Sequence, residues 1–171
     1  MGNDYINPNL GALELREALY DTLSYAKGAA LPTTLAFFTH TISVNGAQVT
    51  NMKKANELPA GEAMDVYRVR IGFRDVAAAD LLAIKQLFAV VMKVAGKEVL
   101  RGPIEMFPGG GSFESTAAFA TFDIPEDLVH KIPPSTTFNF ELVGAGYTLL
   151  DATLGVDIVA MLDGIHAVPR N

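Results

Sequence analysis

The chain has 171 residues, of which 50% are apolar, and a formal net charge of −6. This length and composition fit one domain with a full hydrophobic core. The absence of cysteine excludes disulfides, thiol nucleophiles and cysteine-ligated metal centres. The acidic balance, with no Lys/Arg cluster, argues against direct contact with nucleic acid. The longest apolar stretch, residues 76–92, contains Asp80 and Lys85, so we expect no membrane span.

The first predicted element is an amphipathic helix, with Asn9 as its N-cap and Gly28 as its stop. Its apolar positions recur at steps of three and four: Ala12, Leu15, Leu19, Leu23 and Ala26. Its polar face contains Glu14, Glu17, Asp21 and Ser24. We interpret this face as solvated, and the alternative is a docking surface for another subunit. Residues 1–28 are therefore predicted to be a helical arm whose removal weakens assembly and leaves the β domain folded.

After Pro32 the period changes from helix to strand. Residues 34–44 are predicted to be a strand that ends in an Asn45-Gly46 hairpin turn, and residues 51–61 a loop. The clearest strand has alternating apolar and basic side chains: Tyr67, Val69, Ile71 and Phe73 against Arg68, Arg70 and Arg74. We interpret these arginines as a solubilising device, and the alternative is that they pair with an acidic face of a partner.

The second half predicts a short helical insertion after Asp75, carrying Leu81 and Ile84, and then further strands. The expected strands are residues 87–94, 98–106, 113–122, 138–142 and 156–168. Tight turns are expected at Gly96-Lys97 and at residues 132–135, and Pro103 predicts an edge or a bulge. Pro108 precedes Gly109, Gly110 and Gly111 in what we interpret as a flexible loop that contacts a neighbouring subunit.

About seven or eight short strands joined by Gly/Pro turns predict an all-β, antiparallel β-sandwich. Eight strands in two sheets would make a single jelly roll, which we place at residues 29–171.

No pattern in the sequence indicates catalysis. His40, His130 and His166 lie far apart, which is not the spacing of a metal site on one strand, so we expect each to be structural or exposed, with assembly into a site as the alternative. The three glycines lack the Gly-Lys-Ser/Thr ending of a phosphate cradle. The carboxylate pairs Glu57/Glu62 and Glu126/Asp127 have no aromatic-rich sugar cleft beside them. We therefore expect no enzyme activity, no metal and no cofactor.

Three turn-into-strand stretches carry a resemblance to a known family. They are Leu58-Pro59-Ala60-Gly61-Glu62 before residues 66–73, Arg101-Gly102-Pro103-Ile104 before residues 107–111, and residues 132–138. Over residues 30–170 the chain resembles the small single jelly-roll capsid proteins of tailless icosahedral bacteriophages with an internal membrane, such as the small major capsid proteins of Thermus phages of this kind. The resemblance implies a jelly roll upright in the shell that forms homo-oligomers and meets a second capsid protein and the membrane surface below.

The sequence thus favours a structural subunit of an icosahedral virion, assembled in the host cytoplasm, whose identical copies bury apolar surface against one another. The alternative is a non-catalytic β-sandwich module that binds a carbohydrate or a receptor on a fibre or cell surface. An enzyme on the same scaffold is the third hypothesis, because a fold does not exclude catalysis.

Overall fold

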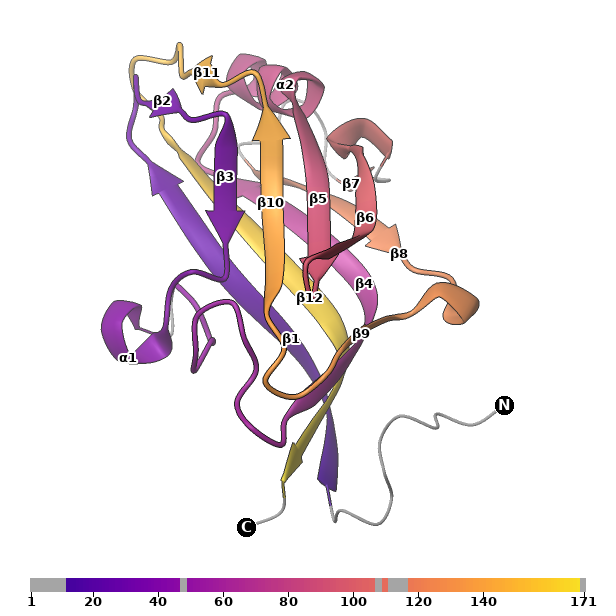
Figure 1. Ribbon diagram of the computed structural model, residues 1–171. Coiled ribbons are helices and arrows are strands. Elements are labelled where there is room, and N and C mark those ends of the chain that lie inside the picture. Colours follow the sequence, from indigo (N-terminus) through magenta and orange to yellow (C-terminus); the bar gives the residue numbers. More distant parts are fainter. Residues whose placement is uncertain (1–11, 47–48, 107–108, 111–116, 170–171) are drawn as a thin grey trace.

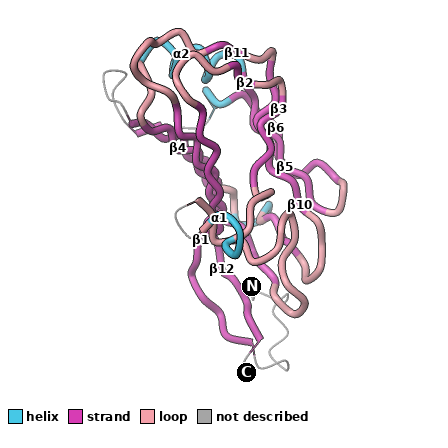
Figure 2. The backbone as a smooth tube through the Cα atoms, turned by 90° about the vertical axis from the view of Figure 1, so that its left-hand side faces the viewer, coloured by secondary structure: helices cyan, strands magenta, loops and turns pink. Residues whose placement is uncertain are grey.

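The computed structural model describes residues 12–46, 49–106, 109–110 and 117–169. Over these residues the chain forms two antiparallel sheets that pack face to face (Figures 1 and 2). The prediction of an all-β antiparallel sandwich is confirmed. The edge-on view of Figure 2 shows the two layers, one containing β4, β1 and β12 and the other β3, β5, β6 and β10.

The first sheet has the strand order β1-β12-β4-β8-β7, and β9 pairs with β4 beyond the end of β8. Its described strands are β1 (Ala12–Tyr25), β4 (Ala63–Arg74), β7 (Gly109–Gly110), β8 (Ala117–Asp123), β9 (His130–Ile132) and β12 (Val156–Pro169). The short 3₁₀ helix η3 (Glu126–Leu128) interrupts the edge between β8 and β9.

The second sheet has the strand order β3-β10-β5-β6. Its described strands are β3 (Thr34–Phe37), β5 (Phe88–Val94), β6 (Lys97–Pro103) and β10 (Phe138–Gly144). The remaining described elements are the pair β2 (Ala30–Leu31) and β11 (Tyr147–Thr148), the helices α1 (Ile42–Asn45) and α2 (Ala78–Leu87), and the 3₁₀ helix η2 (Ile104–Met106). Helix α2 and β11 lie at one end of the sandwich, the top in Figure 1.

The strand pairs are nested along the chain. Strand β1 pairs with β12, β3 with β10, β4 with β8, and β5 with β6. Two further pairings, β12 with β4 and β10 with β5, join these pairs into the two sheets. The chain therefore resembles one long hairpin that has been rolled so that its successive strand pairs alternate between the two facing sheets.

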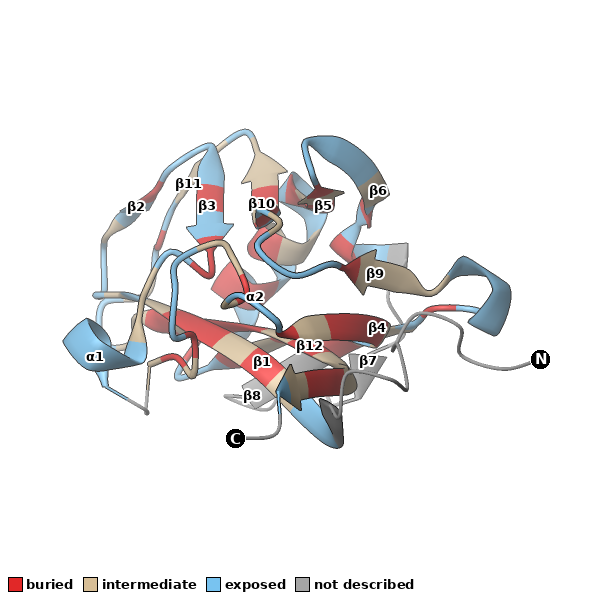
Figure 3. Cartoon of the chain, turned by 60° about the horizontal axis from the view of Figure 1, so that its bottom comes forward, coloured by how far each residue is buried: buried red, intermediate tan, exposed pale blue. Residues whose placement is uncertain are grey.

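The core lies between the sheets and follows the period-two pattern. On β4, Val69, Ile71 and Phe73 are fully buried, and on β10, Phe138, Phe140 and Leu142 are buried to the same degree (Figure 3). Phe38 stacks at a tilt on Phe138, with ring centroids 5.4 Å apart. Burial of such side chains is the main stabilising term, roughly 1.5–3 kcal/mol each.

One β-bulge changes the phase of β4. Asp163 of β12 pairs with Arg68 and the next residue, Gly164, pairs with Val66, so Tyr67 is the extra residue. The inward positions are consequently Met64 and Val66 before the bulge and Val69 after it. Tyr67 was predicted on the buried face, and the bulge leaves it only half-buried.

The predicted N-terminal helix is wrong. Residues 12–25 are the strand β1, which pairs with β12 along its whole length, from Ala12 opposite Pro169 to Tyr25 opposite Val156. The cause is burial by a distant strand, which outweighs local helix propensity. This segment is an integral strand of the first sheet and not an appended arm.

The Asn45-Gly46 hairpin is also wrong. Strand β3 ends at Phe37, and Asn45 is the last residue of the short helix α1, with Gly46 at φ 81° as its C-cap. An Asn-Gly pair tolerates positive φ, which suits a helix stop as well as a hairpin turn.

The helical insertion and the β5–β6 hairpin are confirmed. Leu81 and Ile84 are buried in α2. The β5–β6 turn lies one residue earlier than predicted, at Ala95 and Gly96, which both have positive φ. Pro103 is the last residue of the edge strand β6, as expected for a residue without a backbone N–H.

Candidate functional site

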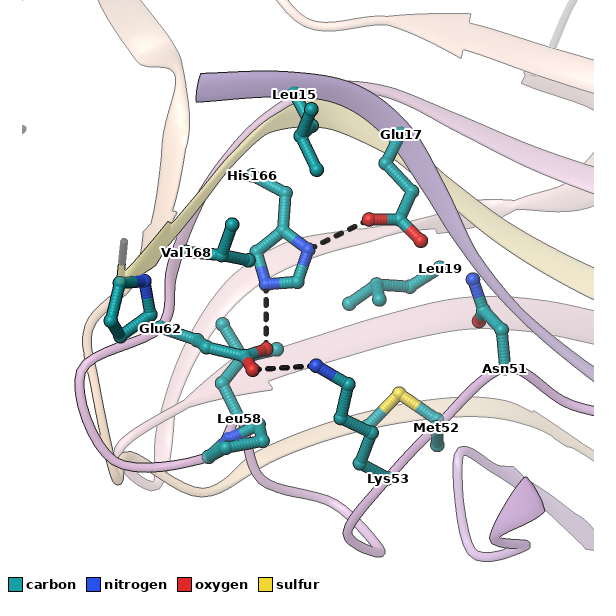
Figure 4. Close-up of a pocket in the computed structure, with 12 residues that line it drawn as sticks. Leu15, Glu17, Leu19, Asn51, Met52, Lys53, Leu58, Glu62, His166 and Val168 are labelled. Carbon is teal, nitrogen blue, oxygen red and sulfur yellow. Dashed lines mark hydrogen bonds and ion pairs between the residues drawn. The ribbon is translucent and has the colours of Figure 1, made fainter. Parts of the chain in front are cut away.

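A hollow of about 390 Å³ lies beside the paired strands β1 and β12. Its walls come from these two strands and from the segment that precedes β4 (Figure 4). The lining residues are Leu15, Glu17, Leu19, Asn51, Met52, Lys53, Leu58, Pro59, Glu62, His166, Val168 and Pro169. Apolar and polar groups share the walls almost equally, and the charged groups gather around His166 (Figure 4).

His166 lies between two carboxylates. Its Nδ1 is 3.0 Å from Glu17 Oε2, and its Nε2 is 3.1 Å from Glu62 Oε2. Lys53 Nζ donates to Glu62 Oε1 at 2.7 Å. His166 is 4% exposed and Glu62 7%, so both are held in a place that water hardly reaches.

Strand periodicity and one glycine build this cluster. Side chains two apart point to the same face of a strand, so Glu17 lies on the inner face of β1 beside Leu15 and Leu19. Gly61 has φ +83°, and a Cβ there would lie 3.0 Å from Pro169 Cγ. Glycine at this position therefore lets the chain turn against the end of β12 and present Glu62 to His166.

The sequence did not predict this cluster. His166 was expected to be structural or exposed, Glu62 was considered only together with Glu57, and Lys53 was not singled out. Glu17 and His166 are 149 positions apart, so no local pattern brings them together. Only the β1–β12 register, in which His166 lies opposite Leu15, could have located it.

The acidic residues assigned to one exposed face have different environments. Glu17 lines the hollow, whereas Asp21 is completely buried. Asp21 accepts the backbone N–H of Phe38 at 2.6 Å and lies 2.9 Å from His40 Nδ1. The side chain of Glu14 lies outside the described part of the structure. The solvated face of a helix is therefore the wrong interpretation for Asp21.

Two of the three arginines on the predicted polar face of β4 form ion pairs within the chain. Arg70 Nη2 donates to Asp163 Oδ1 at 2.7 Å, and Arg68 pairs with Asp123. Both pairs cross neighbouring strands of the first sheet. Arg74 is exposed, and no ion pair joins it to another described residue. A role of these arginines toward a partner stays a prediction.

Gly109 and Gly110 form the short edge strand β7, which pairs with Ala120 and Phe119 of β8. Gly111 lies outside the described residues. Two of the three glycines therefore lie at the edge of the first sheet.

Asp80 forms a second buried polar centre, at the α2 end. Its carboxylate is 1% exposed and accepts three hydrogen bonds: from the Tyr147 hydroxyl at 2.7 Å, from the N–H of Leu150 at 2.9 Å and from the N–H of Asp151 at 3.1 Å. Burial of the Tyr147 hydroxyl raises its pKa to about 12, and the hydrogen bond to Asp80 and the negative charge of Asp80 contribute to the same shift. The cluster fastens the segment after β11 to helix α2.

Several large apolar side chains are exposed on the loops and short helices that connect the strands, which we call the excursions between strands. Leu82 and Leu87 on α2 are 42% and 40% exposed, and Leu150 is 76% exposed. On the other excursions, Val44 of α1 is 81% exposed and Leu128 of η3 is 59% exposed. The sandwich therefore presents apolar groups to solvent at its ends and sides.

The described residues contain no group of three or more His, Asp or Glu side chains that could hold a metal ion. None of the helices in that part of the chain is long and apolar enough to cross a membrane.

No protein-family model matches the sequence, and no curated protein matches it. Among solved structures, the chain is similar to one in the structure of infectious bursal disease virus, Gx strain, with a TM-score of 0.29 and 12% identity. The match covers 91% of this chain and 39% of the viral chain, so this chain spans well under half the length of the chain it matches. The resemblance to phage capsid proteins stays a prediction.

Proposed function

We propose that the chain is a non-catalytic structural subunit of an icosahedral viral shell, built as a single jelly roll. The nested strand pairing carries this proposal. Pairs β1–β12, β3–β10, β4–β8 and β5–β6 divide eight strands between two sheets of four principal strands. A long hairpin rolled in this way is the architecture of a jelly roll, which viral capsid domains share with lectins and cupins.

The exposed apolar side chains are the places where we propose that neighbouring copies make contact. Leu128 and Leu150 protrude from excursions between strands, where the packing of the two sheets does not need them. Contact between identical copies would remove them from water, and weak contacts repeated by symmetry add up in a closed shell.

The proposal includes the virion as the location of the protein and other copies of the chain as its first partners. A second capsid protein and an internal membrane surface are further proposed partners. They rest on the resemblance of residues 30–170 to capsid proteins of membrane-containing phages.

Sedimentation velocity over a range of protein concentrations tests the proposal. We expect the wild-type protein to form large species that negative-stain microscopy shows as regular particles or rings. Leu128→Asp and Leu150→Asp are expected to shift the distribution toward monomer, because each places a charge where apolar contact is proposed. Flotation with lipid vesicles tests the membrane contact separately.

Asn139→Asp is the matched control, because it introduces the same charge at an exposed position on β10. It is expected to leave assembly unchanged. A wild-type protein that stays monomeric at every concentration, alone and with vesicles, would contradict the shell proposal. Saturable binding to members of a glycan array by that monomer would favour the binding-module alternative.

A further inference from the structure

The pair Asn45-Gly46 ends helix α1, and both residues are exposed to solvent. Asparagine is a chemically labile residue, because the backbone nitrogen of the next residue can attack its side-chain amide carbon. Glycine hinders this attack least, since it has no side chain. A Cβ at Gly46 would find no atom within 4 Å other than those of its chain neighbours, so the space around its backbone is open.

Helix α1 holds this pair only weakly. The N–H of Asn45 donates to Thr41 O at 2.8 Å, and the N–H of Gly46 donates to Ile42 O at 3.1 Å. The helix has four residues, none of them buried, and no side chain caps its start. A single helical turn is not stable by itself, because its nucleation fixes several dihedral angles for one hydrogen bond. Local opening of α1 therefore frees the Gly46 nitrogen without disturbing the core.

The other described asparagines are held more firmly. The side chain of Asn51 forms two hydrogen bonds to the backbone of β1, at 2.7 and 2.9 Å. Asn56 is only partly exposed. Asn139 is exposed, but the next residue, Phe140, is fully buried and is paired with β3 on one side and β5 on the other. Among the described residues, Asn45 thus combines an exposed amide, a following glycine and a backbone that can open.

We propose that Asn45 is a site of spontaneous deamidation, in which the chain supplies the nucleophile and water is the co-reactant. In the open turn the Gly46 nitrogen loses its proton to a base in the solvent and forms a bond to Asn45 Cγ. The bond from Cγ to the amide nitrogen breaks, and that nitrogen takes up a proton and leaves as ammonia. Water then opens the resulting cyclic imide: cleavage at Cγ gives aspartate, and cleavage at the backbone carbonyl gives isoaspartate. Neither step oxidises or reduces the chain.

The modification falls on an apolar part of the surface. Either product adds a negative charge next to Val44, which is 81% exposed, and near Ile42, which is 41% exposed. Isoaspartate also lengthens the backbone of the turn by a carbon atom. Aged protein would therefore differ from fresh protein in the charge and shape of this excursion, whether or not the chain builds a shell.

Peptide mapping by mass spectrometry tests the proposal on folded, full-length protein incubated in mildly alkaline buffer. We expect aspartate and isoaspartate to form at position 45 at least about tenfold faster than at Asn139, because the Phe140 nitrogen is freed only when β10 leaves its sheet. Labelling with an isoaspartyl methyltransferase identifies the isoaspartate. Equal rates at the two positions, or no conversion of Asn45, overturn the proposal.

A parallel sample in concentrated urea measures how far the fold protects Asn45. Because α1 opens easily, the folded protein should convert Asn45 no more than about tenfold more slowly than the unfolded chain. Stronger protection would show that α1 keeps the Gly46 nitrogen in place, and this result would also overturn the proposal.

Two substitutions assign the acidic species that ion-exchange chromatography separates from the incubated protein. Asn45→Gln is expected to abolish the main species, because glutamine would have to close a larger and less favourable ring. Asn139→Gln is the matched control at an exposed position on β10, and it is expected to leave that species unchanged. Persistence of the main species in Asn45→Gln would assign the modification to another residue and contradict the proposal.

Discussion

Asp21 of β1 accepts the backbone N–H of Phe38 at 2.6 Å, and this hydrogen bond links the first sheet to the residue that follows β3 of the second sheet. Phe38 follows β3 and has φ 62°, so its N–H has left the regular ladder. Because the carboxylate is completely buried and also contacts His40, it satisfies polar groups that would otherwise be stranded in the core.

Asp21→Ala is expected to lower the free energy of unfolding by about 3 kcal/mol, because it removes a charge-assisted hydrogen bond and leaves the buried N–H of Phe38 without an acceptor. Urea denaturation measures this as a lower midpoint with an unchanged slope. Asp127→Ala, at an exposed position, serves as the control and should shift stability by about 0.5 kcal/mol or less. Equal effects of the two changes would show that Asp21 is not a structural link.

Tyr147 should lose its proton only at an unusually high pH. Burial and the neighbouring Asp80 raise its pKa to about 12, so the folded state favours the neutral phenol. This contribution to stability is fully present below the unfolded pKa near 10 and is lost as the pH rises toward 12. The difference in tyrosinate absorbance between wild type and Tyr147→Phe isolates this group. A midpoint near 10 would contradict the Asp80 contact.

His130 of β9 should oppose folding in mild acid. Burial lowers its pKa below the ordinary 6.5, so the unfolded chain binds a proton that the folded chain resists. Its contribution is therefore present above about pH 6.5 and is lost as the pH falls through the folded pKa. NMR titration of the imidazole, assigned with His130→Gln, should give a midpoint below 6.5. A higher midpoint would show a stabilised imidazolium instead.

Two glycines of the first sheet should respond differently to alanine. A methyl group at Gly164, beside the β-bulge, would overlap the carbonyl oxygen of Asp65, so Gly164→Ala is expected to cost about 2–3 kcal/mol. At Gly72 the nearest atom, Val159 Cβ, would lie 3.7 Å away, and Gly72→Ala should cause no loss beyond about 0.5 kcal/mol. Thermal unfolding of both variants checks the contrast, which equal melting temperatures would refute.

Removal of residues 1–28 is now expected to abolish cooperative folding, the reverse of the expectation from the sequence. The deletion takes away β1 and leaves β12 with an open edge and an uncovered core position at Leu19. Thermal unfolding followed by circular dichroism checks this prediction, and the expected result is the loss of a sharp transition. A deletion that stops before Ala12 keeps the β1–β12 pairing and is the control. A cooperatively folding protein without residues 1–28 would refute the structural role of β1.

The error over β1 has a simple geometric cause. Leu15, Leu19 and Leu23 are four residues apart, and a step of four returns to the same face in a helix and also in a strand. The residues between them decide the case, since a strand turns Asp21 into the core, while Glu17 borders the hollow and stays exposed. An acid in the core is unfavourable unless it is paired, and the partners of Asp21 lie beyond this strand, at Phe38 and His40.

Elsewhere the local pattern was sufficient. Strand β10 was predicted from Phe138, Phe140 and Leu142, and these side chains are buried as expected. The candidate site could not be predicted in the same way. Its groups belong to three segments whose meeting depends on strand pairing, and a single sequence does not encode that pairing in any local pattern.

The nested pairing determines the order in which the strand pairs can form during folding. The β5–β6 hairpin closes over the two residues Ala95 and Gly96, so it can form while the rest of the chain is still being translated. Strand β1, the first described strand to leave the ribosome, must wait for β12, the last. Such high contact order slows folding and leaves the early apolar strands exposed to aggregation until synthesis of β12 is finished.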